Sequence, residues 1–128
     1  MIQGAGALAI WALCSAAASE DAVVESAVRK FREDFYRLGA REDDRLSALH
    51  ALSAHRHEKT VACLSPVLTR SVLPARILAA RILGQFGKVP AASRELRLAL
   101  RSAATQTRKT VAVRIEILRA LGVLKAVE

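Results

Sequence analysis

His55 and His57, followed by Glu58, are the residues of this sequence that come closest to a metal site. A spacing of two does not place both imidazoles on one helical face, and a credible site needs three or four converging ligands. The three residues also stand at the junction of two expected helices, where a solvated turn accounts for them. We therefore expect no metal and no cofactor.

His50 could act as a base on a nucleophile, either Cys63 or a serine, if the fold brought them together. Cys63 stands in the run Val-Ala-Cys-Leu, which is typical of a small buried hydrophobe, and no activated-nucleophile motif surrounds either residue. The acidic runs at 33–34 and 42–44 are explained by ion pairs along a helix and by a helix N-terminus, respectively. We expect no catalytic residue and predict that the chain is not an enzyme.

Arginine is the most frequent charged residue in the C-terminal half of the chain. Residues 59–128 hold thirteen bases and three acids, a balance of +10, whereas residues 19–58 have a balance of −2. A surface for nucleic acid, anionic lipid or an acidic protein has this character, and so does an ordinary solvated helix face. The candidate binding surface consists of arginines that share a helical stripe or a repeat position: Arg76, Arg81, Arg94, Arg97, Arg101, Arg114 and Arg119.

Residues 4–18 form an apolar run, GAGALAIWALCSAAA, without a charged side chain. The run is too short for a stable membrane span, and its small residues before Ser19 are those that a signal peptidase reads. No Lys or Arg precedes it, which leaves a buried first helix as the alternative. We predict a signal peptide over residues 1–18, a secreted or periplasmic location with the cytoplasm as the alternative, and no membrane span after its removal.

The composition favours helices. Hydrophobic residues make up 52% of the 128 residues and aromatic residues only 4%, which suits close helix packing. Apolar residues recur at spacings of three and four, and the first such series predicts one helical face: Val24, Val28, Phe31, Phe35 and Leu38. Caps, prolines and glycines divide the chain into six expected helices, at about 19–39, 42–55, 58–70, 74–86, 90–102 and 105–127.

Three of these helices share a sequence pattern. Residues 45–53, 76–84 and 114–122 align as Arg, aliphatic, any, small or aliphatic, apolar, polar, apolar, Leu, and Gly or Ser, at intervals of 31 and 38 residues. One helical hairpin cannot bury its apolar face alone, so such repeats stack. We predict an all-α fold in which residues 19–128 form a short α-solenoid of about three antiparallel hairpins. Its expected core includes Leu49, Leu52, Ala79, Ile82, Leu83, Ile117, Leu118 and Leu121.

The pattern resembles the second helix of HEAT repeats, including the HEAT-like repeats of the phycobilin-lyase type. Residues 76–84 and 114–122 match it well, whereas residues 45–53 end on Ser53 where the family has glycine. The aspartate that the family has in the preceding turn is matched only near residues 43–44. The resemblance covers residues 20–126 and implies a HEAT-like repeat domain. It also implies that an arginine at the repeat position braces adjacent hairpins.

The leading interpretation is a non-enzymatic protein–protein interaction module, a scaffold for an unidentified acidic protein partner. The alternative is intracellular binding of nucleic acid or another polyanion through the basic half, as HEAT-like DNA glycosylases cradle a phosphate backbone. Phe86 is the only aromatic residue of that half that could stack on a base, which weakens the alternative. A third interpretation is an enzyme or a chromophore-lyase accessory, for which no residue stands out.

Overall fold

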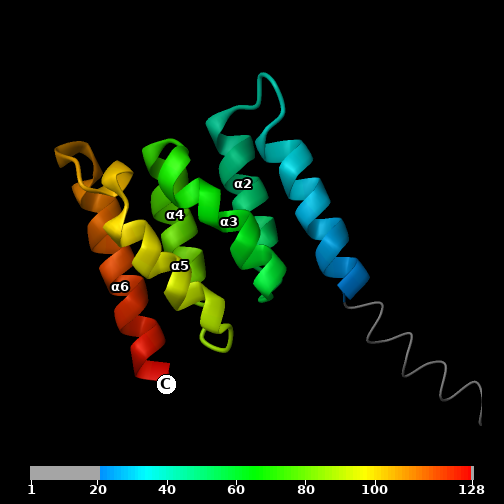
Figure 1. Ribbon diagram of the computed structural model, residues 1–128. Coiled ribbons are helices and arrows are strands. Elements are labelled where there is room, and N and C mark those ends of the chain that lie inside the picture. The colour runs from blue at the N-terminus through cyan, green and yellow to red at the C-terminus, as the bar shows by residue number, and fades with distance from the viewer. Residues whose placement is uncertain (1–20, 128) are drawn as a thin grey trace, which may run out of the picture.

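The computed structural model describes residues 21–127, and this part of the chain is all-helical, without strands (Figure 1). Residues 21–35 are the described part of a first helix, which is followed by α2 (Glu42–Leu52), α3 (Glu58–Arg70), α4 (Leu73–Leu83), α5 (Pro90–Arg101) and α6 (Val111–Val127). Two short 3-10 turns, η1 (Ala103–Thr105) and η2 (Arg108–Thr110), precede α6. The predicted all-α fold is confirmed. The signal peptide predicted over residues 1–18 lies outside the described residues.

The helix ends follow local chemistry. Pro74 and Pro90 stand in the first turns of α4 and α5, where a missing backbone N–H leaves no hydrogen bond unmade. Three acidic residues fill the first turn of α2, where negative charge is favourable to the helix dipole. His57 caps α3, because its Nδ1 accepts a hydrogen bond from the backbone N–H of Lys59 at 3.1 Å.

The first helix ends earlier than its periodicity predicts. The helix stops at Phe35, and the chain then turns through Gly39, whose φ of +77° lies in the left-handed region that glycine adopts at little cost. Leu38 falls in this turn and is 98% exposed, so it does not continue the helical face on which its spacing placed it. α2 similarly ends at Leu52 rather than at residue 55.

The helices pack in two layers. α2 packs against α4 and α4 against α6 in one layer, while α3 packs against α5 in the other. Successive helices run up and down, and α3–α4 and α5–α6 join the layers (Figure 1). The first helix lies beside α3, where Glu25 forms an ion pair with Lys59, and beside α2. The three segments that share the sequence pattern therefore lie side by side on α2, α4 and α6.

One continuous core fills the space between the layers. Six of the eight predicted core residues are buried, and Leu121 is half-buried. Leu118 is 56% exposed, which corrects its predicted burial. It aligns with Leu49 and Ala80, which are fully buried because α4 covers α2 and α6 covers α4. Among the described residues no further helix covers α6, so the same repeat position faces outward there.

Gly84 marks a close approach of α4 to α6. A Cβ at this position would lie 2.8 Å from the Ala120 Cβ and 3.0 Å from the Ala120 Cα. Gly84 has an ordinary helical φ of −62°, so the glycine is required for space and not for backbone conformation. Gly122, its repeat equivalent on α6, would have no atom within 4 Å of such a Cβ. The small residue of the pattern is therefore needed where a neighbouring helix is present.

We expect Gly84→Ala to lower the free energy of unfolding by about 1–3 kcal/mol, because α4 and α6 must move apart. Gly122→Ala is the matched control and should raise it by about 0.5–1 kcal/mol, since alanine is the better helix former and meets no neighbour. Urea denaturation followed by circular dichroism measures both. A Gly84→Ala protein as stable as the wild type would contradict the tight contact between these helices.

Candidate functional site

Arg76, one of the seven arginines predicted to form a binding surface, is buried, with only 6% of its surface exposed. Its Nε donates a hydrogen bond to the Leu68 carbonyl at 2.7 Å, and its Nη2 donates to the Ala104 carbonyl and to Thr105 Oγ1, both at 3.2 Å. Burial lowers the pKa of Arg76 from its usual value. The side chain thus ties the end of α3 and η1 to α4. Because the side chain is buried, Arg76 is not part of an exposed basic surface, and its hydrogen bonds hold these segments together.

Arg81 and Arg119 are exposed, and both contact Glu116. Arg81 Nε lies 3.2 Å from Glu116 Oε1, and Arg119 Nη1 lies 3.8 Å from Glu116 Oε2. The Glu116 side chain is mostly buried between them, at 12% exposure. This cluster joins α4 to α6 within one layer. Arg114, the repeat arginine of α6, is half-buried.

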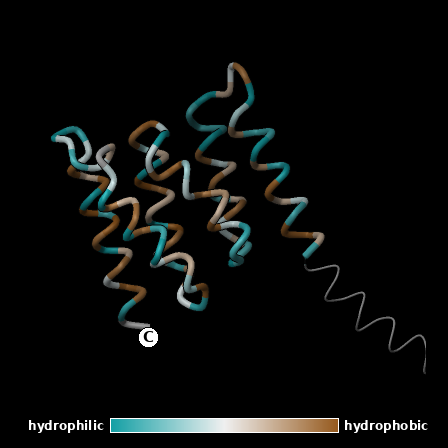
Figure 2. The backbone as a smooth tube through the Cα atoms, viewed as in Figure 1, coloured by the Kyte–Doolittle hydropathy of each residue, from teal (hydrophilic) through white to brown (hydrophobic). Residues whose placement is uncertain are grey.

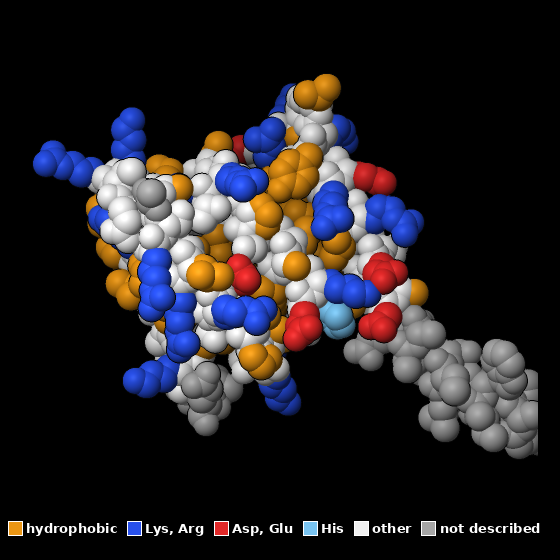
Figure 3. Space-filling model, viewed as in Figure 1, with side chains coloured by type: hydrophobic (Ala, Val, Ile, Leu, Met, Phe, Trp, Pro, Cys, Tyr) orange, Lys and Arg blue, Asp and Glu red, His pale blue; other side chains and the backbone are white. Residues whose placement is uncertain are grey.

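Arg94, Arg97 and Arg101 are exposed along one side of α5, as their spacing predicts, while the opposite side of this helix is buried. They belong to the layer of α3, whereas Arg81 and Arg119 belong to the layer of α2, α4 and α6. The arginines of the candidate binding surface therefore divide between the two layers. Figure 3 likewise shows basic side chains scattered over the face in view.

The outward side of α6 has a stripe of exposed apolar residues. Val111, Ile115 and Leu118 are 43%, 45% and 56% exposed, and Gly122 continues the series at a spacing of four. These spacings place the four positions on one face, which we call the α6 stripe. The opposite face of the helix is buried against the protein: Val113, Ile117, Ala120 and Leu124. Hydrophobic positions are visible along α6 in Figure 2 and along this edge of the molecule in Figure 3.

Basic side chains border the α6 stripe. The helical periodicity places Arg114 and Lys125 along one side of the stripe and Arg119 along the other. Arg97 of α5 joins this border, because Arg97, Gly122 and Lys125 line a shared hollow of about 190 Å³ between α5 and α6. The structure thus combines an apolar centre with a basic rim at the C-terminal end of the two layers.

His57 and Cys63, which the sequence offered for metal binding and catalysis, are accounted for by the fold. No group of three or more His, Cys, Asp and Glu that could hold a metal ion occurs within residues 21–127. His57 caps α3, and its Nε2 lies 3.6 Å from Asp21 Oδ1. His50 is exposed, whereas Cys63 lies in the core. Burial raises the pKa of Cys63, which favours the thiol over the nucleophilic thiolate.

The described residues place this protein in the all-α class, with its helices packed in two layers. A scan of the sequence against protein-family models finds no match, and searches of curated proteins and of solved structures find none. Within the described part of the chain, no helix has both the length and the apolar character needed to cross a membrane.

The α6 stripe was missed in the sequence because its central residue, Leu118, aligns with core residues of the other repeats. One signal was present. Apolar residues occur on both sides of this helix, Val111 and Ile115 on one side and Val113 and Ile117 on the other. A helix with apolar residues on two opposite faces either buries both faces or leaves one of them without a partner.

Proposed function

We propose that the chain is a short α-solenoid of HEAT-like hairpins that works as a protein–protein interaction module and binds an acidic amphipathic helix along the α6 stripe. The observation that carries the proposal is the exposure of Leu118 at a repeat position where Leu49 and Ala80 are fully buried. In a stack of hairpins each repeat covers the apolar face of the one before it. α6 covers α4 in this way and has an equivalent face of its own.

The border of the stripe favours acidic flanks on the partner. A helix that lays its apolar side on the α6 stripe brings its flanking residues next to Arg114, Arg119 and Lys125, where acids are attracted and bases repelled. A second copy of the chain would bring the same basic residues together, which disfavours self-association. Polyanion binding stays the second candidate because of the +10 balance of residues 59–128, but a phosphate backbone would leave the apolar stripe uncovered.

The direct probe is a designed helical peptide with leucines on one face and glutamates beside them. We expect Leu118→Gln to weaken its binding at least about tenfold, equivalent to about 1.4 kcal/mol, because the stripe loses its most exposed apolar side chain. Leu98→Gln is the matched control, because Leu98 is also 56% exposed but lies on α5, outside the stripe. It should leave the affinity within about twofold of the wild type. Fluorescence anisotropy of the labelled peptide gives both affinities.

The dependence of binding on peptide charge and on salt distinguishes an acidic helix from the other possible partners of the α6 stripe. The same peptide with lysines in place of its glutamates should bind more weakly, and added salt should weaken the glutamate peptide. Preferred binding of duplex DNA that is unaffected by Leu118→Gln would instead favour the polyanion alternative, with log affinity falling steeply with log salt. Dimers in sedimentation that Leu118→Gln abolishes would identify a second copy as the occupant.

A further inference from the structure

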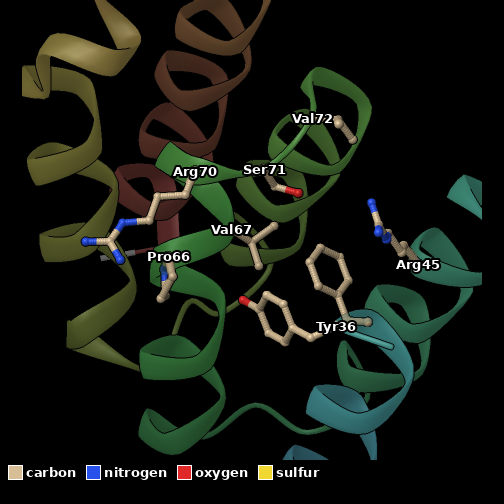
Figure 4. A pocket seen from close by; sticks show the side chains of 8 residues that line it. Tyr36, Arg45, Pro66, Val67, Arg70, Ser71 and Val72 are labelled. Carbon is tan, nitrogen blue, oxygen red and sulfur yellow. The ribbon is translucent and has the colours of Figure 1, made fainter. Parts of the chain in front are cut away.

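A hollow of about 270 Å³ opens where the first helix ends, between that helix, α2 and α3 (Figure 4). Phe35, Val67 and Val72 give it apolar walls. Figure 4 shows the Tyr36 ring within the site, Arg45 to one side, and Ser71 and Val72 along its upper edge. The hollow lies between the first helical hairpin and the hairpin of α3 and α4, and it shares no lining residue with the α6 stripe.

Arg45 occupies the repeat position that Arg76 occupies one repeat later. Arg76 donates to three acceptors: the carbonyls of Leu68 and Ala104 and the hydroxyl of Thr105. Arg45 Nε is buried without a hydrogen-bond partner, and Arg45 takes part in none of the ion pairs within residues 21–127. A buried donor without a partner is destabilising by about 1–3 kcal/mol, so this guanidinium favours an added acceptor.

The lengths of two connections explain the difference between the two arginines. Residues 102–110 join α5 to α6 and include η1, whereas only Ser71 and Val72 join α3 to α4. The seven additional residues account for the repeat interval of 38 instead of 31. The longer connection includes Ala104 and Thr105, two of the three residues that accept hydrogen bonds from Arg76. The equivalent connection beside Arg45 consists of Ser71 and Val72 alone, and the space that it leaves is the hollow.

We propose that this hollow binds a carboxylate attached to an apolar body, with the carboxylate taking the place at Arg45 that the acceptors of η1 take at Arg76. A guanidinium presents a planar fork of donors that matches a carboxylate. The hydroxyls of Tyr36 and Ser71 add donors at the same site, and none of the described lining residues is acidic. Arg70 also lines the hollow, but its guanidinium points away from Tyr36 (Figure 4).

The apolar walls select the class of ligand. Phe35, Val67 and Val72 favour a hydrophobic body, which a phosphate group alone does not have. The volume of about 270 Å³ lies near the lower end of ligand pockets, so it suits one ring or one side chain. The phenol of Tyr36 is protonated at neutral pH and can donate a hydrogen bond, and partial desolvation raises its pKa further. Such a carboxylate belongs either to a small molecule or to the C-terminal residue of a peptide.

Titration of the ¹⁵N-labelled protein with 3-phenylpropionate, observed by NMR, tests the site. We expect saturable shifts at Tyr36, Ser71 and Val72 and at the Nε–H of Arg45, and affinity at least about tenfold lower for 3-phenylpropanamide, which lacks the charge. Two short peptides ending in phenylalanine, one with a free C-terminus and one amidated, form the second arm. Preference for the free peptide over phenylpropionate identifies a chain terminus as the ligand, and the reverse identifies a small molecule.

Arg45→Gln should lower the affinity at least about tenfold, whereas Arg56→Gln, at an exposed arginine outside the hollow, should leave it unchanged. Val72→Phe fills the hollow without removing the charge and should also abolish binding; circular dichroism confirms that each variant is folded. Equal binding of acid and amide, unchanged affinity of Arg45→Gln, or the absence of saturable shifts with every probe would each overturn the proposal. Each of these results is independent of whether the α6 stripe binds a helix.

Discussion

Replacing Leu83 by aspartate is expected to remove most of the stability of the fold. Leu83 ends α4 and is fully buried within the continuous core. The substitution loses about 2–3 kcal/mol of leucine burial and places a carboxylate where the surrounding core side chains are apolar. We expect a loss of at least about 4 kcal/mol, out of a typical total of 5–15 kcal/mol for a domain. Urea denaturation followed by circular dichroism at neutral pH measures it.

Leu118→Asp is the matched control for this substitution. It makes the same chemical change on α6, where the side chain is 56% exposed, and should alter the free energy of unfolding by about 0.5 kcal/mol or less. Comparable losses in the two proteins would show that Leu118 is covered in solution. That result would contradict the free α6 stripe and would direct attention to a second copy of the chain as its cover.

The helices were largely predictable because their signals are local. α3 occupies residues 58–70 as predicted, since His57 and Glu58 mark its start and the chain reaches Pro74 soon after its end. The first helix was predicted too long because apolar periodicity continues to Leu38, beyond the point where the chain turns. Periodicity reports which residues share a face; the end of a helix depends on the turn that follows it.

The environment of each repeat position was not predictable from the pattern. Leu49 and Leu118 occupy one position, but only Leu49 has a neighbouring helix over it among the described residues. Arg45 and Arg76 share another position, yet the connection that satisfies Arg76 comes from η1, about thirty residues further along the chain. A single repeat segment contains no information about a neighbour of this kind. The candidate sites therefore lie where the repeats differ, which only the packing shows.

Arg76→Met should lower the free energy of unfolding by about 2–4 kcal/mol. Methionine keeps the apolar stem of the side chain, so the loss reports on the guanidinium. The carbonyls of Leu68 and Ala104 and the Thr105 hydroxyl would lose the donor that reaches them. Leu68 stands in the last turn of α3, where a carbonyl has no partner within its helix. Arg76→Lys should not restore the stability, since one ammonium does not span three acceptors.

Arg45→Met is the matched control for Arg76→Met. Arg45 stands at the same repeat position, but its Nε has no hydrogen-bond partner, so its removal leaves no acceptor unmatched. We expect the free energy of unfolding to change by less than about 1 kcal/mol. The change should be an increase, because the substitution removes a buried donor without a partner. Thermal and urea unfolding of the two variants give the difference directly. Equal losses would mean that both arginines are satisfied in solution, which would contradict the open acceptor position beside Arg45.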